Sequence, residues 1–218
     1  MRFSLLLLLL MTACTSCAVF PSVVGQTPRE QHNAMVLIKK TCANGAIGLG
    51  TGLMVSEDRV LTARHVIQCE ILPGVPVYQE PERVDVYGSP EDFAEAEVEL
   101  ELNEKYDIAR LKLVNKNLAK FFTPVRVAPM PEVGEKICEV SAVPRPTYRC
   151  GEAQNPLYGK LMIGFPIERG NSGSAVFNDR GELVGIVTNQ IMCERGSTGI
   201  CGGFGTPMIG FSWLIPTE

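Results

Sequence analysis

The stretch from residue 96 to residue 102 alternates strictly between apolar and acidic residues. One side of an extended chain would carry Val98, Leu100 and Leu102, and the other would carry Glu97, Glu99 and Glu101. A period of two residues is the pattern of a half-buried β-strand. We therefore interpret the three glutamates as the solvent face of a strand, with a cation site as the alternative.

Short apolar runs recur along the chain between turns. Ile108 to Val114 repeats the alternation, and Asn178 to Gly181 is a turn signal that joins two runs into a hairpin. The 21 glycines and 15 prolines favour turns and short strands over long helices. We expect strands at residues 35–39, 47–55, 60–63, 96–102, 108–114, 136–140, 148–152, 160–164, 175–177, 183–188 and 208–214. Many short strands of this kind predict an all-β barrel architecture.

The first 33 residues differ from the rest of the chain. Arg2 precedes an apolar run from Leu5 to Leu10 that is too short to span a bilayer, which is typical of a signal peptide. The segment Met11-Thr12-Ala13-Cys14 resembles a bacterial lipobox, so we expect lipidation at Cys14 and an outer-membrane anchor facing the periplasm. The alternative is cleavage after Ala18, which would release a soluble secreted protein. Residues 1–18 are thus the predicted signal peptide and 19–33 a tether.

Six further cysteines follow this segment, and an even number in an exported protein indicates disulfides. Sequence proximity suggests that Cys138 pairs with Cys150 and Cys193 with Cys201. Cys42 would then pair with Cys69 and tie the loop that carries His65. Six cysteines allow 15 pairings, and the alternative is that some are free and buried.

Length and charge limit the classes of function. The 218 residues suit one domain, or two small lobes that share one site. A net charge of −4 argues against nucleic acid as a main partner. The spacing contains no paired CxxC or HExxH metal motif after residue 33, so we expect no metal or other cofactor.

The most informative chemistry lies in Gly170-Asn171-Ser172-Gly173-Ser174. A serine hydroxyl becomes a useful nucleophile when a base can take its proton. Glycines on both sides allow a tight turn with amide hydrogens that point at a substrate oxygen. The candidate base is His65, because the chain contains just one other histidine, His32, in a polar N-terminal stretch.

These segments resemble trypsin-like serine proteases over residues 34–216. Thr62-Ala63-Arg64-His65 resembles the TAAH signature of that family, and the segment from Asp107 to Leu111 resembles its D-[IL]-A-x-[LI] pattern. Gly170 to Ser174 is similar to GDSGG, and closer to the GNSGS of bacterial glutamyl endopeptidases. Gly210 to Pro216 resembles the last barrel strand of bacterial high-temperature-requirement proteases.

The resemblance implies two six-stranded antiparallel β-barrels with the active site in the cleft between them. The trypsin-like domain would span residues 34–218, with barrels over about 34–118 and 119–216 and a polar linker from Asn115 to Pro124. We expect no carboxy-terminal peptide-binding module, because no apolar repeat or extra sequence follows the segment that resembles the closing strand.

The resemblance also assigns roles to residues. Ser172 would be the nucleophile, His65 the general base and Asp107 the group that orients His65. Asp85 and Asp92 lie between His65 and Ser172 too, but Asp107 begins an apolar strand in the family's pattern. The backbone amides of Gly170 and Ser172 would form the oxyanion hole. An α/β-hydrolase is excluded, because position 174 is not glycine and no histidine follows the nucleophile.

Substrate preference is expected from the residues that match the family's specificity pocket. Pro166 would form its base, and one wall would run through Thr188, Asn189 and Gln190. Because no acid occupies the base and no histidine the wall, we expect a small or apolar side chain before the cut rather than Lys, Arg or Glu.

The sequence therefore predicts an exported serine endopeptidase that acts on protein or peptide substrates. One alternative is a catalytically inactive binding module of the cell envelope on the same scaffold, because fold does not fix function. Another is an esterase, because the same acyl-transfer groups cleave esters.

Overall fold

The computed structural model describes residues 23–24, 33–71, 78–102, 105–143, 146–192 and 200–215. The predicted signal peptide, Cys14, and residues 19–22 and 25–32 of the tether lie outside the described residues. Among the helices of the described part, none is long and apolar enough to cross a membrane.

The first barrel is a closed ring of six strands in the order β2-β3-β4-β9-β8-β7. Each neighbouring pair is antiparallel, and the side chains alternate between the barrel core and the outside. On β2, Val36 and Ile38 are fully buried in the core. The strands are β2 (Met35–Thr41), β3 (Ile47–Ser56), β4 (Arg59–Ala63), β7 (Arg83–Tyr87), β8 (Phe93–Glu101) and β9 (Ile108–Leu113).

The acidic stretch lies on β8, and its glutamates point outward. Glu99 forms ion pairs with Arg59 at 3.1 Å and Arg110 at 2.8 Å, and Glu101 pairs with Arg64 at 2.7 Å. The described residues contain no group of three or more His, Cys, Asp or Glu side chains that could hold a metal ion. The glutamates therefore belong to an outer face that is balanced by arginines.

The second barrel is also a ring of six strands, in the order β11-β10-β13-β14-β15-β12, and β12 closes the ring on β11. The short β1 (Val23–Val24) adds to β11 outside the ring. The strands are β10 (Lys136–Ser141), β11 (Thr147–Leu157), β12 (Lys160–Ile163), β13 (Ala175–Asn178), β14 (Leu183–Met192) and β15 (Ile200–Pro207). The predicted fold of two six-stranded antiparallel barrels is confirmed.

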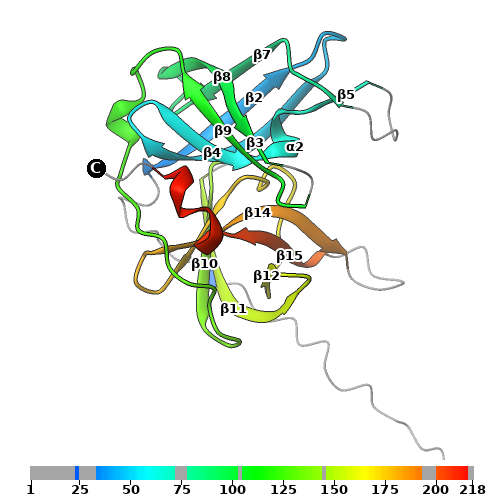
Figure 1. Cartoon of the computed structure of the whole chain (residues 1–218), viewed down its shortest axis with the longest axis vertical. Helices are drawn as coiled ribbons and strands as arrows, with labels where there is room; N and C mark the ends of the chain where they lie inside the picture. The colour runs from blue at the N-terminus through cyan, green and yellow to red at the C-terminus, as the bar shows by residue number, and fades with distance from the viewer. Residues whose placement is uncertain are drawn as a thin grey trace, which may run out of the picture.

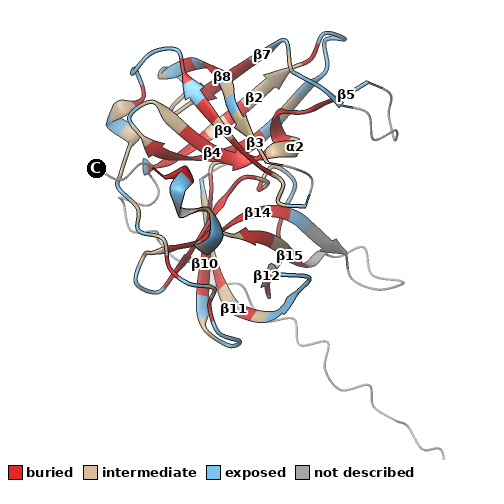
Figure 2. Cartoon of the chain, viewed as in Figure 1, coloured by how far each residue is buried: buried red, intermediate tan, exposed pale blue. Residues whose placement is uncertain are grey.

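The two barrels lie against each other, and the segments at their junction are largely buried (Figures 1 and 2). A shared apolar cluster joins them there. The first barrel contributes Leu53, Leu61 and Ile108, and the second contributes Val140 and Phe177, all of them fully buried. Because these residues lie on the strands next to the site motifs, the shared cluster sets the position of one barrel's site residues relative to the other's.

The predicted strand over residues 208–214 is wrong, and so is its match to a closing barrel strand. The segment forms η2 (Ile209–Leu214), two short 3₁₀ turns separated by a kink at Phe211, and it lies at the junction of the barrels (Figure 1, red). Met208, Phe211 and Leu214 all pack on the shared cluster. The apolar side chains of this segment thus pack between the barrels, and the segment does not extend a sheet.

Some elements give no clear signal in the sequence. β15 contains Gly202, Gly203 and Gly205, so it has no apolar alternation to detect. β7 was not predicted, and neither were the short strands β5 (Cys69–Glu70) and β6 (Tyr78–Gln79). The predicted linker contains a short 3₁₀ helix, η1 (Ala119–Phe121), after the fully buried Leu118.

Two predicted disulfides are confirmed. Cys42 bonds to Cys69 across a sequence separation of 27 residues, and Cys138 bonds to Cys150 across paired strands. Cys193 lies outside the described residues, so its pairing with Cys201 stays a prediction.

Candidate active site

His65 lies in the short helix α2 (Arg64–Ile67), directly after β4. The pairing of β4 with β9 places Ala63 opposite Ile108, and this register brings Asp107 beside His65. Asp107 Oδ2 lies 2.7 Å from His65 Nδ1, and Asp107 Oδ1 accepts a hydrogen bond of 3.0 Å from the His65 backbone N–H. The carboxylate thus holds both the ring and the backbone of His65, and Nε2 is the ring nitrogen left for a nucleophile.

Asp107 has a positive φ of 54°, a left-handed conformation that few residues other than glycine adopt. The second barrel holds the peptide that precedes it, because the Tyr106 carbonyl accepts hydrogen bonds from Lys160 Nζ at 3.4 Å and from the Thr206 hydroxyl. Burial lowers the pKa of Lys160, and the charge of Asp107 opposes this shift. Sequence reasoning missed Lys160 and Thr206, since contacts to a backbone carbonyl leave no motif.

The turn that carries Ser172 is pressed against the first barrel. Thr51 on β3 donates its backbone N–H to the Ser172 carbonyl at 2.9 Å, and its hydroxyl to the Gly170 carbonyl at 3.1 Å. Gly173 has a φ of +85°, and a Cβ there would lie 2.0 Å from the Thr51 carbonyl oxygen. Position 173 therefore requires glycine for both its conformation and its close approach. Thr62, three residues before His65, donates its hydroxyl to the same Thr51 carbonyl at 2.7 Å.

The backbone amides of the turn fall into two groups. Those of Asn171, Gly173 and Ser174 donate hydrogen bonds inside the protein, to the carbonyls of Glu168, Val187 and Asn171 respectively. Within the described residues, the N–H groups of Gly170 and Ser172 donate to no protein acceptor. They are the two amides predicted to form the oxyanion hole, and they are free to bind a substrate oxygen.

Ser172 and His65 come from different barrels and are connected through Thr51 and Thr62. In the described part of the chain, no hydrogen bond joins the Ser172 hydroxyl to the His65 ring. Contacts between nucleophile and base commonly shorten when substrate binds.

The residues predicted to set specificity lie on the second barrel. Pro166 is half-buried and its carbonyl accepts a hydrogen bond of 3.3 Å from Arg149, while Thr188 is buried on β14. Asn189 is exposed, and Gln190 pairs with Gly203 on β15. None of the four predicted positions carries a charge.

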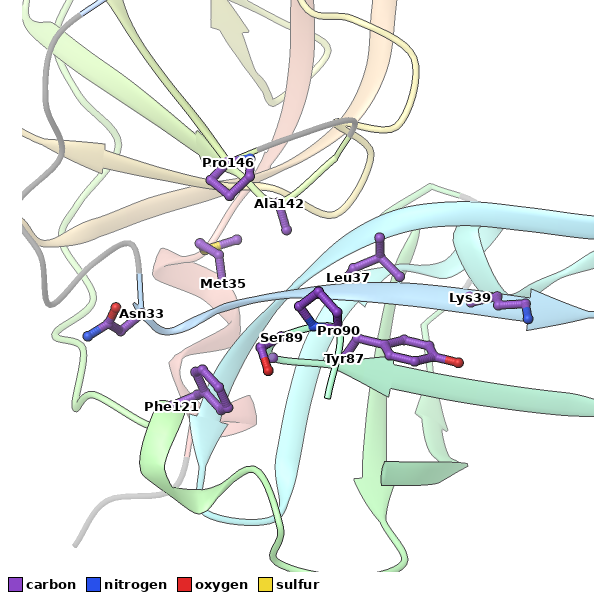
Figure 3. Close-up of a pocket in the computed structure, with 11 residues that line it drawn as sticks. Asn33, Met35, Leu37, Lys39, Tyr87, Ser89, Pro90, Phe121, Ala142 and Pro146 are labelled. Atoms are coloured by element: carbon purple, nitrogen blue, oxygen red, sulfur yellow. The ribbon is translucent and has the colours of Figure 1, made fainter. Parts of the chain in front are cut away.

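Several hollows lie on the described part of the first barrel, and two of them are lined by His65 or by a residue of the second barrel. One of about 340 Å³ is lined by His65, Lys40, Glu70 and Tyr78, so it opens beside the candidate base. The other, of about 390 Å³, contains neither His65 nor Ser172. It runs along the outer side of β2 near Met35 and Leu37, towards Ala142 of the second barrel (Figure 3).

Glu139 on β10 is a further polar residue near the turn that sequence reasoning did not single out. It is 0 % exposed, and Asn171 Nδ2 donates a hydrogen bond to its Oε1. Burial raises the pKa of the Glu139 carboxyl to about 7, against the opposing effect of the Asn171 hydrogen bond. The sequence did contain a signal. Glu139 is two residues from Ile137 and therefore lies on the same side of the strand, while the other side, with Cys138 and Val140, is also apolar.

Several solved structures share this fold. The serine endoprotease from Yersinia pestis superposes with a TM-score of 0.65 at 23% identity, over 87% of this chain and 68% of the other. The active form of a protease from M. tuberculosis gives a TM-score of 0.63 at 18% identity, over 86% and 83% of the two chains. The HtrA-type protease AlgW with a tripeptide gives a TM-score of 0.62 at 21% identity, over 82% of this chain and 57% of AlgW. The match thus spans little more than half of the AlgW chain.

A family model adds evidence at the level of sequence. The trypsin-like peptidase domain matches residues 50–186, which is more than half of the 218 residues and includes His65, Asp107 and Ser172. The two-barrel fold and the His65–Asp107 contact agree with that match. The chain belongs to the family of trypsin-like peptidases.

Proposed function

We propose that the chain is an exported serine endopeptidase that uses Ser172, His65 and Asp107. The observation that carries the proposal is the 2.7 Å contact between His65 Nδ1 and Asp107 Oδ2. In this contact Asp107 is the carboxylate that orients the ring, and His65 is the base. The hydrogen bonds of Thr51 hold the Ser172 turn against the barrel that carries both residues.

In the first half of the reaction, Ser172 Oγ attacks the scissile carbonyl carbon while His65 Nε2 takes the hydroxyl proton. Asp107 stabilises the imidazolium through Nδ1–H. The oxyanion of the tetrahedral intermediate accepts hydrogen bonds from the free amides of Gly170 and Ser172, and loss of one such donor typically costs about 10²–10³ in rate. The carbon–nitrogen bond then breaks, and His65 returns its proton to the leaving amine.

In the second half, water replaces the amine. His65 takes a proton from water as the oxygen attacks the acyl-enzyme carbonyl, and the same two amides bind the second oxyanion. The bond to Ser172 Oγ then breaks, Ser172 regains its proton from His65, and the carboxylic acid product leaves.

The proposed substrates are proteins or peptides. The structure of AlgW, which shares the fold, contains a tripeptide. The uncharged positions Pro166, Thr188, Asn189 and Gln190 support a small or apolar side chain before the cut.

Hydrolysis of denatured casein by purified protein tests the activity, with Ser172→Ala as the matched variant. We expect the parent to release peptides, and the residue before each new N-terminus to be small or apolar. Intact casein after incubation with a folded, disulfide-bonded parent would favour the inactive binding module, and cleavage that survives in Ser172→Ala would exclude this serine as the nucleophile.

We also propose that Cys14 carries a lipid that anchors the protein to the outer membrane. The lipobox-like segment before Cys14 supports this. Growth with a labelled fatty acid should mark the parent and leave Cys14→Ala unmarked. An unmarked parent would contradict the anchor and favour secretion after cleavage at Ala18.

A further inference from the structure

Glu139 is a buried carboxyl group that the proposed mechanism does not use. It lies in the middle of β10, between Arg149 on β11 and Val176 on β13, and it is 0 % exposed. Alternation places it on the same side of β10 as Ile137, a member of the apolar core of the second barrel. A carboxyl group in such surroundings needs polar partners, because burial of an unpaired charge is costly.

The partners of Glu139 come from the turn that carries the nucleophile. Asn171, directly before Ser172, is 0 % exposed and donates its Nδ2–H to Glu139 Oε1. Within the described residues, Glu139 Oε2, Asn171 Oδ1 and Ser174 Oγ are buried without a hydrogen-bond partner. Buried polar atoms are paired in the great majority of cases, so three orphans around one contact need an explanation.

The charged groups around Glu139 do not supply a counter-ion. Arg149 faces it across β10 and β11, but its guanidinium lies 2.5 Å from Glu168 Oε1 and donates to the Pro166 carbonyl. The charge of Arg149 lowers the pKa of Glu139, while that of Glu168 raises it. β13 contributes Val176 at the paired position. The turn contributes the neutral side chains of Asn171 and Ser174, which lie close enough to the carboxylate to lower its pKa, although Ser174 Oγ forms no well-aligned hydrogen bond with it.

A proton on Glu139 would give two of the unpaired atoms, Glu139 Oε2 and Asn171 Oδ1, a hydrogen-bond partner. In the ionised carboxylate, Oε2 is an acceptor, as is Asn171 Oδ1, so the two cannot pair. In the neutral acid, Oε2–H is a donor that Asn171 Oδ1 can accept, while Asn171 Nδ2–H continues to donate to Oε1. The acid and the amide would then share two hydrogen bonds, and both side chains would be held in one orientation.

We propose that neutral Glu139 is a positioning residue for the nucleophile turn, which locks Asn171 and thereby keeps the Gly170 and Ser172 amides aimed at the substrate carbonyl. Ionisation of Glu139 breaks one of the two hydrogen bonds and loosens the turn. The inference rests on the proposed function, because the turn matters for rate through the acyl-transfer reaction at Ser172. It explains the unpaired Glu139 Oε2 and Asn171 Oδ1, the buried acid and the identity of residue 171 together.

The test is the rate of fluorophosphonate labelling as a function of pH, in the parent, Glu139→Gln, Glu139→Ala and the control Glu152→Gln. Glutamine resembles the neutral acid in shape and keeps one donor and one acceptor. Glu152 is exposed on the neighbouring β11, away from the turn.

We expect the parent and Glu152→Gln to lose labelling rate between pH 7 and 9, by about tenfold or more, because the neutral fraction of an acid falls tenfold per pH unit above its pKa. Glu139→Gln should keep its rate over that range. Glu139→Ala should label slowly at every pH. The fall towards acid pH, where the general base becomes protonated, should remain in all four proteins.

The outcomes separate the two proposals. Absence of labelling in the folded parent at every pH would contradict the proposed function. Labelling of the parent with the same alkaline fall in Glu139→Gln would overturn the role of Glu139 alone.

Thermal unfolding gives a readout that does not need activity. From about pH 4.5 to about pH 7 the melting temperature of the parent should fall relative to that of Glu139→Gln, because the unfolded chain ionises Glu139 over this range while the folded protein keeps its proton. If the difference in melting temperature between the two proteins did not change with pH, the proposed pair of hydrogen bonds between Glu139 and Asn171 would be contradicted. This holds even if the protein is inactive.

Discussion

Asp107 combines a chemical role with a backbone conformation that most residues avoid. Its carboxylate holds His65 in two places, and its φ is 54°. Asn is among the residues that tolerate this region, whereas Ala is not. Two replacements of Asp107, by Asn and by Ala, can therefore distinguish its effect on the reaction rate from its effect on the stability of the fold.

We expect Asp107→Asn to remain folded and to lose about 10⁴-fold in labelling or turnover rate, since an amide stabilises the wrong ring tautomer and no imidazolium. Asp107→Ala should lose activity too, and in addition about 1 kcal/mol of stability from left-handed strain. Kinetics and urea unfolding of the pair measure both effects. An active Asp107→Asn would remove Asp107 from the mechanism.

Gly173 and Gly134 form a matched pair at the same φ of +85°. A Cβ at Gly173 would lie 2.0 Å from a backbone oxygen of Thr51, whereas a Cβ at Gly134 would meet nothing within 4 Å. We expect Gly134→Ala to cost about 1 kcal/mol from strain alone. Gly173→Ala should cost about 2–4 kcal/mol and slow Ser172, since the turn must move. If urea unfolding showed equal losses of free energy of unfolding for Gly173→Ala and Gly134→Ala, the close approach of Gly173 to Thr51 would be unimportant.

At the scale of elements, alternation predicts a strand where one side is apolar and the other polar. β2, β8 and β9 have this pattern and were predicted to within a few residues. β15 has no such pattern because three glycines interrupt it, and η2 misleads because its apolar residues also occur at short spacing.

The disulfide between Cys42 and Cys69 closes the segment that contains β3, β4 and α2. Its removal in the Cys42→Ser/Cys69→Ser variant should lower the free energy of unfolding by about 3–4 kcal/mol, because the unfolded chain gains freedom. We expect reduced activity as well, since Cys69 lies four residues after His65 on the rim of the hollow beside it. Urea unfolding measures the loss. An unchanged midpoint would contradict a structural role for this bond.

At the scale of the whole molecule, the site exists where two barrels meet, and the shared cluster determines how they meet. The order of His65, Asp107 and Ser172 and the local motifs were enough to predict both barrels and the contact between His65 and Asp107. Contacts between segments far apart in the sequence were not predictable. Lys160 and Thr206 bind a backbone carbonyl, and Glu139 pairs with a turn 32 residues away. Such partners depend on three-dimensional packing rather than on any local spacing.

The buried Glu139 should also make the stability of the whole protein depend on pH. Its pKa is raised in the folded state to about 7 from 4.5. The folded protein therefore binds this proton more tightly than the unfolded chain does, and the resulting stability is present below about pH 4.5 and lost as pH rises through about 7. Across that window the parent should lose about 3 kcal/mol relative to Glu139→Gln in urea unfolding. If the free energy of unfolding changed with pH by the same amount in both proteins, the raised pKa of Glu139 would be contradicted.

The most direct test of Ser172 as an activated nucleophile is to find which residue a fluorophosphonate modifies. Purified parent protein is treated with the reagent, digested and mapped by mass spectrometry, beside Ser172→Ala and His65→Ala. We expect one phosphonylated peptide with the adduct on Ser172, no adduct in Ser172→Ala and at most slow labelling in His65→Ala. An unmodified, folded parent, or an adduct on any other residue, would contradict the assignment of Ser172 as an activated nucleophile.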